Sequence, residues 1–161
     1  MKIKVISMNK KDFLIITCLR KNARESLTNM SKRTNIPIST IYERLKTNTD
    51  GLIHKHTSLI DFNKLGFSTR ANIMLRVHKD SKEDLKKYLL NYFQVNSLYR
   101  INNGYDFLVE GIFRHLKELE EFLDNLETRF NIEHKEIHYI IDDLKREAFM
   151  TDPLFLELAQ N

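Results

Sequence analysis

Apolar residues in the first fifty positions recur at helical spacing in three short segments. The first segment runs from about Lys10 to Lys21, the second from Leu27 to about Thr34, and the third begins near Ser39. Ser26 and Ser39 are good helix caps, and Asn35 tolerates the left-handed backbone conformation that a tight turn requires. Three short helices joined by tight turns predict a helix-turn-helix unit.

The third segment has two distinct faces. Ile41 and Leu45 lie four residues apart and form its buried stripe. The opposite face carries hydroxyl and charged side chains, which can contact phosphates or base edges in a DNA major groove. A solvated helix face is the alternative, but the three-helix spacing favours DNA binding. The predicted DNA-binding residues are Arg24, Lys32, Arg33, Ser39, Thr40, Tyr42, Arg44 and Lys46.

The run after Gly51, from residue 52 to 60, is rich in residues that favour extended structure. It predicts the wing of a winged helix, with His54, Lys55 and His56 near DNA phosphates. His54 and His56 would share one face of a strand, as metal ligands often do. No cysteine or carboxylate stands beside them, so we expect no metal site.

The second half of the chain alternates between strand and helix patterns. We expect a strand at 71–77, followed by a helix from Ser81 to about Phe93 with Leu85, Leu89 and Phe93 on one stripe. Strands at 97–101 and 107–113 should be joined by an Asn-Asn-Gly turn. A helix at 116–130 and a strand at 137–141 complete the pattern. This order predicts a ferredoxin-like βαββαβ domain and an α+β fold class. Apolar residues on both faces of the strands predict a homodimer that pairs sheet to sheet, with tetramers and octamers left open.

Charge is distributed unevenly along the 161 residues. The net charge is +4, but residues 1–60 carry twelve Lys/Arg against four Asp/Glu, and the remaining residues carry a net −4. The basic half is therefore expected to bind a polyanion such as double-stranded DNA. The single Cys18 excludes an internal disulfide and fits a reducing compartment. No apolar run has the length of a signal peptide or membrane span, so we expect a cytoplasmic chain with no membrane partner and no cofactor.

Several segments of the first half match the motifs of one family. They are Asp12–Ile16 with Leu19, and residues 22–24, 30–33, 36–44, 51–53 and 61–66. Together they resemble the N-terminal domain of the feast/famine regulatory proteins, the Lrp/AsnC family. Asn35 stands where that family often has Gly, and the chain is one residue short between Arg44 and Gly51. Residues 47–50 are weak helix formers, so the recognition helix is expected to end early.

The segment from Gly104 to Leu108 resembles the turn and strand signature of the same family's C-terminal domain. The usual order is Gly, a polar residue, Tyr and Asp, whereas here Asn103 takes the first place and Gly104 the second. The resemblance implies that this turn binds an effector, an amino acid or a related metabolite. The alternative is a plain hairpin turn. The implied effector-binding residues are Asn102, Asn103, Gly104, Tyr105 and Asp106.

These patterns predict a sequence-specific DNA-binding transcription regulator that dimerises through its C-terminal domain. The expected organisation is a winged helix-turn-helix domain at 1–60, a hinge at 61–67, a ligand-sensing and oligomerisation domain at 68–142, and a tail at 143–161. The tail is expected to be partly helical, with a helix that starts near Pro153. Two alternatives stay open. One is an enzyme like the siroheme decarboxylases, which share this architecture, although the histidines of the second half form no catalytic constellation. The other is a hetero-oligomer partner that has lost DNA binding, because residues 47–50 are unusual.

Overall fold

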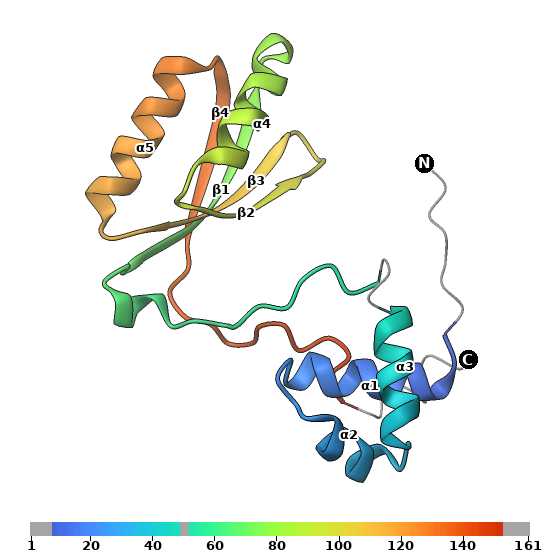
Figure 1. The fold of residues 1–161 in the computed structure, drawn as a ribbon. Coiled ribbons are helices and arrows are strands. Elements are labelled where there is room, and N and C mark those ends of the chain that lie inside the picture. Colours follow the sequence, from blue (N-terminus) through green and yellow to red (C-terminus); the bar gives the residue numbers. More distant parts are fainter. Residues whose placement is uncertain (1–7, 49–51, 153–161) are drawn as a thin grey trace. The chain divides into compact units, whose positions relative to one another are not determined.

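The computed structural model describes residues 8–48 and 52–152. The chain divides into two compact units: residues 1–59 together with 144–161, and residues 60–143. Figure 1 shows the helices of the first unit and the sheet of the second. Within the described stretches, no helix is both long and apolar enough to cross a membrane. The predicted helix start near Pro153 lies outside the described residues.

The first unit contains helices α1 (Lys10–Lys21), α2 (Leu27–Thr34) and α3 (Ile38–Asn48). Asn9 caps α1 in a capping box, because its side chain accepts the Asp12 N–H at 3.1 Å while Asp12 accepts the Asn9 N–H at 3.1 Å. Ser26 caps α2, and Asn35 closes it with φ 56°, in the left-handed region. The three predicted helices are therefore present.

Asn22 is the C-cap of α1, in an extended conformation with φ −151°, and its N–H donates to the Cys18 carbonyl at 2.9 Å. One predicted helix cap is wrong. Ser39 lies inside α3, because the Pro37 carbonyl already accepts the Ile41 N–H at 3.0 Å and starts the helix. α3 also extends through Asn48, so the helix includes two of the four residues that were expected to end it.

A small apolar core joins the three helices. It consists of Ile15, Cys18, Met30, Ile36 and Ile41, which are all buried. Since α1, α2 and α3 each contribute to it or pack against it, the inner side of α3 is fixed by this core. The opposite side of α3 is left to solvent.

The expected wing strand is not formed in the described part of its segment. Residues 53–61 have no regular secondary structure, and the next element is the 3-10 helix η1 (Phe62–Leu65), which Gly66 ends with φ 85°. A strand is stabilised by a neighbour that accepts and donates its ladder hydrogen bonds. The described residues around this run supply no such neighbour, so its β propensity is not realised.

The second unit contains the expected βαββαβ order. Its elements are β1 (Thr69–Val77), the 3-10 helix η2 (Lys79–Ser81), α4 (Lys82–Asn91), β2 (Val95–Arg100), β3 (Phe107–Phe113), α5 (Leu116–Arg129) and β4 (Ile132–Tyr139). The strands lie in the order β2-β3-β1-β4, and every neighbouring pair is antiparallel. The last strand begins at Ile132, earlier than the periodicity predicted, and ends before Ile141.

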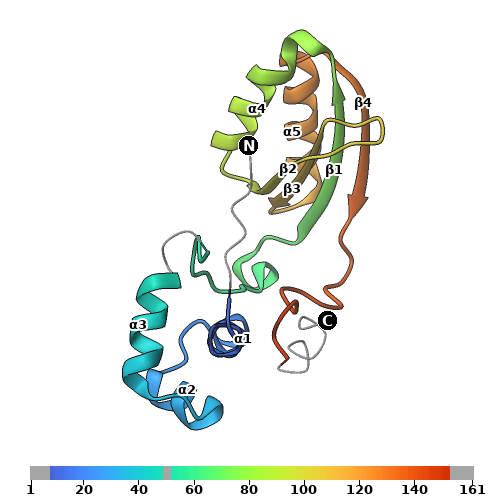
Figure 2. The ribbon, with the colours of Figure 1, turned by 90° about the vertical axis from the view of Figure 1, so that its right-hand side faces the viewer.

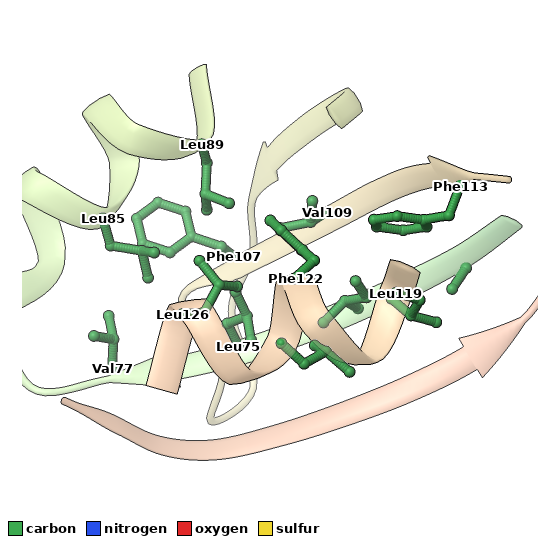
Figure 3. Close-up of a cluster of buried hydrophobic side chains, with 13 residues drawn as sticks. Leu75, Val77, Leu85, Leu89, Phe107, Val109, Phe113, Leu119, Phe122 and Leu126 are labelled. Atoms are coloured by element: carbon green, nitrogen blue, oxygen red, sulfur yellow. The ribbon is translucent and has the colours of Figure 1, made fainter. Parts of the chain in front are cut away.

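Helices α4 and α5 cover the same face of this sheet (Figure 2). Figure 3 shows how Leu85 and Leu89 from α4 and Phe122 from α5 meet buried residues of the strands, among them Leu75 and Val109. Burial alternates along β1, as expected for a strand with one face in the core.

Phe93 was predicted to share the buried stripe of α4, and this is wrong. The Phe93 side chain is 83% exposed. The reason is that α4 ends at Asn91, so the helical spacing that would have brought Phe93 under Leu89 is broken before it.

Candidate DNA-binding surface and effector site

The solvent side of α3 carries a mixed set of polar and apolar side chains. Ile41 is fully buried and Leu45 packs against the same core, so both point inward. We call the opposite side the outer face of α3. It consists of Ile38, Ser39, Tyr42, Glu43, Lys46 and Thr47, all of which are exposed.

Arg44 lies beside the core rather than on the outer face. Its Nη1 is 3.5 Å from Asp12 Oδ2, and the Asp12 side chain is only 5% exposed. Asp12 Oδ1 has no hydrogen-bond partner within the described stretches. The pair joins α3 to the first turn of α1, so the predicted DNA contact Arg44 has a structural partner.

Arg33 is also held by a carboxylate. Its Nη1 donates to both oxygens of Glu25, at 2.8 and 2.7 Å, and this hydrogen-bonded partner raises the pKa of Arg33 above its usual value. The remaining predicted residues lie on α3 and in or near α2. Ser39, Tyr42 and Lys46 lie on the outer face of α3, and Thr40 on the same helix is half-buried. Arg24, just before α2, and Lys32, within α2, are both exposed.

A contact that sequence analysis missed joins the C-terminal segment, residues 144–152, to α1. The Arg20 guanidinium donates to the carbonyl of Phe149 at 3.1 Å, the carbonyl of Glu147 at 3.1 Å and the Glu147 carboxylate at 3.0 Å. Glu147 and Met150 adopt positive φ angles of 49° and 61°. The partners are more than a hundred residues apart in sequence, and no local pattern signals their contact.

The predicted effector turn connects β2 to β3. Asn103 and Gly104 adopt positive φ angles of 62° and 89°, as a tight turn requires. The Asp106 carboxylate accepts the Val77 N–H at 3.1 Å and forms an ion pair with Lys82 at the start of α4. Burial alone would raise the pKa of Asp106, but Lys82 and the Val77 N–H together lower it below its usual value.

Tyr105 points toward β4. Its hydroxyl donates to Glu136 at 2.6 Å, and its ring centroid lies 5.7 Å from that of His134. The hydrogen bond raises the pKa of Tyr105 and lowers the pKa of Glu136. The turn is thus attached to β1 and α4 through Asp106 and to β4 through Tyr105.

A surface hollow of about 510 Å³ lies at this turn. Five of its lining residues are those predicted to bind the effector, Asn102 to Asp106. The others are Arg76, Val77, Lys79, Lys82 and Glu133. Cationic, anionic and amide groups therefore surround one hollow, a combination that suits a small zwitterion. Over the described parts of the chain, no group of three or more His, Cys, Asp or Glu side chains could hold a metal ion.

The sheet face away from α4 and α5, here called the open face, combines apolar residues with an ion network. Met74 pairs with Leu108, which pairs with Tyr99, so these three form a row across β1, β3 and β2. Beside the row, Arg70 forms ion pairs with Glu110 at 2.6 Å and with Asp143 at 2.7 Å. Sequence analysis predicted the apolar part of this face but not the network.

Comparison with known proteins decides the family. Residues 8–47 match the model of a winged helix-turn-helix DNA-binding domain, and residues 70–148 match the Lrp/AsnC ligand-binding domain. The HTH-type transcriptional regulator FL11 of Pyrococcus abyssi is 31% identical over 120 residues, which are 74% of this chain and 80% of that protein. The chain belongs to the Lrp/AsnC family.

Solved structures of the Lrp/AsnC fold agree with the architecture. A transcriptional regulator of Neisseria meningitidis, solved as a complex with L-Met, is 21% identical with a TM-score of 0.81, covering 87% of this chain and 94% of that chain. AsnC of E. coli is 18% identical with a TM-score of 0.77, covering 88% and 97%. At these identities the likeness shows the fold.

Membership of the Lrp/AsnC family makes the protein a helix-turn-helix transcription regulator with a ligand-binding domain. Its curated relatives are named as transcriptional regulators, which confirms the predicted regulator and excludes the enzyme alternative. The winged helix-turn-helix assignment and the ferredoxin-like fold are likewise confirmed.

Proposed function

We propose that this regulator binds specific DNA sequences as a homodimer, with the outer face of α3 in the major groove. The observation that carries the proposal is the division of α3 into a buried side and an exposed side. Ile41 fixes the inner side in the three-helix core, while Ser39, Tyr42 and Lys46 stand on the exposed side. Hydroxyl, aromatic and ammonium groups at this spacing can contact base edges and phosphates.

Lys32 and Arg24 supply further phosphate contacts. Both are exposed, and among the described residues neither has a carboxylate ion-pair partner of the kind that holds Arg33. Arg33 and Arg44 were predicted to contact DNA, but in our proposal they stabilise the unit through Glu25 and Asp12. A cation already paired with a carboxylate gains less from a phosphate, because the first partner must be given up.

The homodimer forms through the open face of the sheet. The row of Met74, Leu108 and Tyr99 presents apolar surface there, and Tyr99 is exposed. Apolar surface at the centre with polar groups around it is the common composition of protein interfaces. Two-fold pairing of the sheets would give the assembly two DNA-binding units, which suits a palindromic site.

The effector is an amino acid or a related zwitterion, bound in the hollow at residues 102–106. An amino acid carries a carboxylate and an ammonium group a few ångströms apart. Lys79 can attract the carboxylate. Arg76 and Glu133 form an ion pair at 2.9 Å, which a bound amino acid would open so that its carboxylate meets Arg76 and its ammonium group meets Glu133. The N. meningitidis regulator with this fold was solved with L-Met, which supports an effector of this class.

The test of DNA binding is a salt titration with duplexes of the regulator's own promoter region and of random sequence. A dimer that contacts several phosphates should bind the promoter preferentially, with a log–log salt slope of roughly −0.9 per phosphate contact. Lys32→Ala removes one phosphate contact from each of the two subunits and should flatten this slope by about 1.8, whereas the matched variant Lys86→Ala, on α4, should leave it unchanged. Absent or salt-insensitive binding would refute the proposal and favour the hetero-oligomer partner.

The test of the effector site is a set of thermal shifts with the twenty amino acids. An amino acid that binds the native state raises Tm, because binding adds to the free energy of unfolding. Glu133→Gln should abolish the shift if Glu133 holds the ammonium group. The control Glu121→Gln, on the exposed side of α5, should retain it.

A further inference from the structure

Two large apolar side chains lie on the outer face of α3. Ile38 is 45% exposed and Tyr42 is 62% exposed. They are four residues apart, so they are neighbours on the helix surface. The core of the unit is completed by Ile41 and its partners on the other side, so Ile38 and Tyr42 are not needed to fill it. An exposed apolar pair on a DNA-facing surface indicates an apolar target.

The arginines nearest to α3 are committed elsewhere. Arg44 pairs with Asp12 across to α1, and Arg33 pairs with Glu25. The commonest side chain for reading guanine, an arginine with a two-pronged guanidinium, is therefore not offered by the outer face. What this face offers near its start is an isoleucine, a serine and a tyrosine.

The major groove displays one apolar group, the C5-methyl of thymine. Residues near the start of a recognition helix contact base edges, and Ile38 is the first residue of α3. One helical turn separates Ile38 from Tyr42, about 6 Å along the axis. Base pairs are stacked about 3.4 Å apart. The two side chains can therefore reach two thymines one or two steps apart.

Resting on the proposed DNA-binding function, we infer that Ile38 and Tyr42 determine specificity by packing against thymine methyl groups in the operator. The ring and not the hydroxyl of Tyr42 makes this contact. The operator is then recognised mainly through apolar contacts at these positions, with phosphate contacts adding affinity that is independent of sequence.

The experiment replaces thymine with deoxyuridine, which removes the methyl group and leaves base pairing intact. The operator is first located by footprinting, and each thymine inside the footprint is then changed singly. Removal of a methyl group that packs against Ile38 or Tyr42 should weaken binding about fourfold, the factor for ~0.8 kcal/mol per buried apolar carbon. Deoxyuridine outside the footprint is the matched control on the DNA.

Protein variants assign each methyl group to a side chain. For each sensitive position, the affinity for the thymine duplex is divided by the affinity for the deoxyuridine duplex. Ile38→Ala and Tyr42→Ser should each lower this affinity ratio from about four to about one at one position, while the ratio at the other position stays unchanged. Tyr42→Phe should retain its ratio, because the ring remains. Circular dichroism melting checks that the exposed substitutions leave the fold intact.

The outcomes separate this inference from the function on which it rests. If the protein binds its operator specifically but no deoxyuridine substitution changes the affinity, the inference about thymine methyl groups is overturned and the DNA-binding function is not affected. Ratios near four that survive both Ile38→Ala and Tyr42→Ser overturn the assignment to these side chains. No specific duplex binding at all overturns the proposed function itself, and the inference with it.

Discussion

Replacing Arg44 with alanine tests whether an arginine of the recognition helix serves the fold or the DNA. In the native structure the guanidinium lies 3.5 Å from the Asp12 carboxylate, which is almost fully buried. The substitution would leave that carboxylate with the Asn9 N–H at 3.1 Å on one oxygen, while the other oxygen lacks a partner among the described residues. A buried charge without its counter-ion is costly.

The expected loss follows from this geometry. Two unit charges 3.5 Å apart attract each other by about 5 kcal/mol at an effective dielectric constant of about 20. The Arg44 side chain is 43% exposed, so water screens most of that attraction. We therefore expect Arg44→Ala to lower the free energy of opening the first unit by about 1 to 2 kcal/mol.

Hydrogen exchange of the α1 and α3 amides is the appropriate assay. It reports opening of the first unit separately from that of the sheet, which global unfolding of a two-unit chain does not. The double variant Asp12→Asn with Arg44→Ala is the control, because it removes the stranded charge while the amide oxygen can still accept the Asn9 N–H. Protection should return in part, with a coupling energy of about 1 to 2 kcal/mol between the two sites.

DNA binding provides the refuting result. If Arg44 serves the fold, the salt slope of binding stays the same in Arg44→Ala, although affinity falls as the unit opens. The reasoning is wrong if protection of α1 and α3 is unchanged and the slope flattens by about 1.8, which corresponds to one lost phosphate contact in each subunit. Arg44 would then contact a phosphate, and its pairing with Asp12 would contribute nothing measurable.

Three further changes test the sheet unit and the C-terminal segment. Lys82→Met should shift acid unfolding of the sheet unit to higher pH. The pKa of Asp106 is lowered in the folded state, so its carboxylate contributes stability that is present above the unfolded-state pKa and is lost as pH falls through the folded-state pKa. The substitution raises the folded-state pKa, because it removes the ammonium group of Lys82. Gly111→Ala should lower the free energy of unfolding by about 1 to 3 kcal/mol and reduce Tm, since the added Cβ would lie 2.5 Å from the ring of buried Phe113. Arg20→Ala should accelerate hydrogen exchange in the C-terminal segment and leave the sheet unchanged; equal exchange in both proteins would show that the three hydrogen bonds do not hold the segment.

Local sequence signals were sufficient for most of the secondary structure. Capping residues and periodicity are read within a few positions, so the limits of α2 follow from Ser26 and Asn35. Periodicity gave a wrong prediction where a helix ended before the last residue of its predicted apolar stripe. Phe93 fits the spacing of α4, yet the helix stops two residues earlier and leaves the ring in solvent.

The wing shows the limit of β propensity. Residues 52–60 favour extended backbone, but a strand is defined by its neighbour, and propensity says nothing about where a neighbour will be. β4 shows the converse case. In its first half Ile132 and Lys135 are half-buried, and Glu133 and His134 between them are exposed. This stretch carries little apolar signal, yet pairing with β1 makes it a strand.

The turn between β2 and β3 was predicted from its Asn-Asn-Gly sequence, while its hydrogen bonds were not. Asn103 and Gly104 adopt the positive φ angles that such a turn requires. That Asp106 would be bound by Lys82, and Tyr105 by Glu136, depends on side chains from α4 and β4. Those partners are far away in sequence and become visible only when the strands are in register.

The candidate DNA surface shows most clearly what a single sequence can and cannot assign. Helical periodicity separates the inner from the outer side of α3, because that separation depends on position alone. It does not separate cations that face DNA from cations that hold helices together, because Arg33 and Arg44 are distinguished from Lys32 by carboxylates on other segments. Charge in a recognition helix therefore predicts affinity for a polyanion, while specificity must be sought in the exposed residues that have no partner in the described part of the unit. On α3 those residues are the exposed Ile38 and Tyr42.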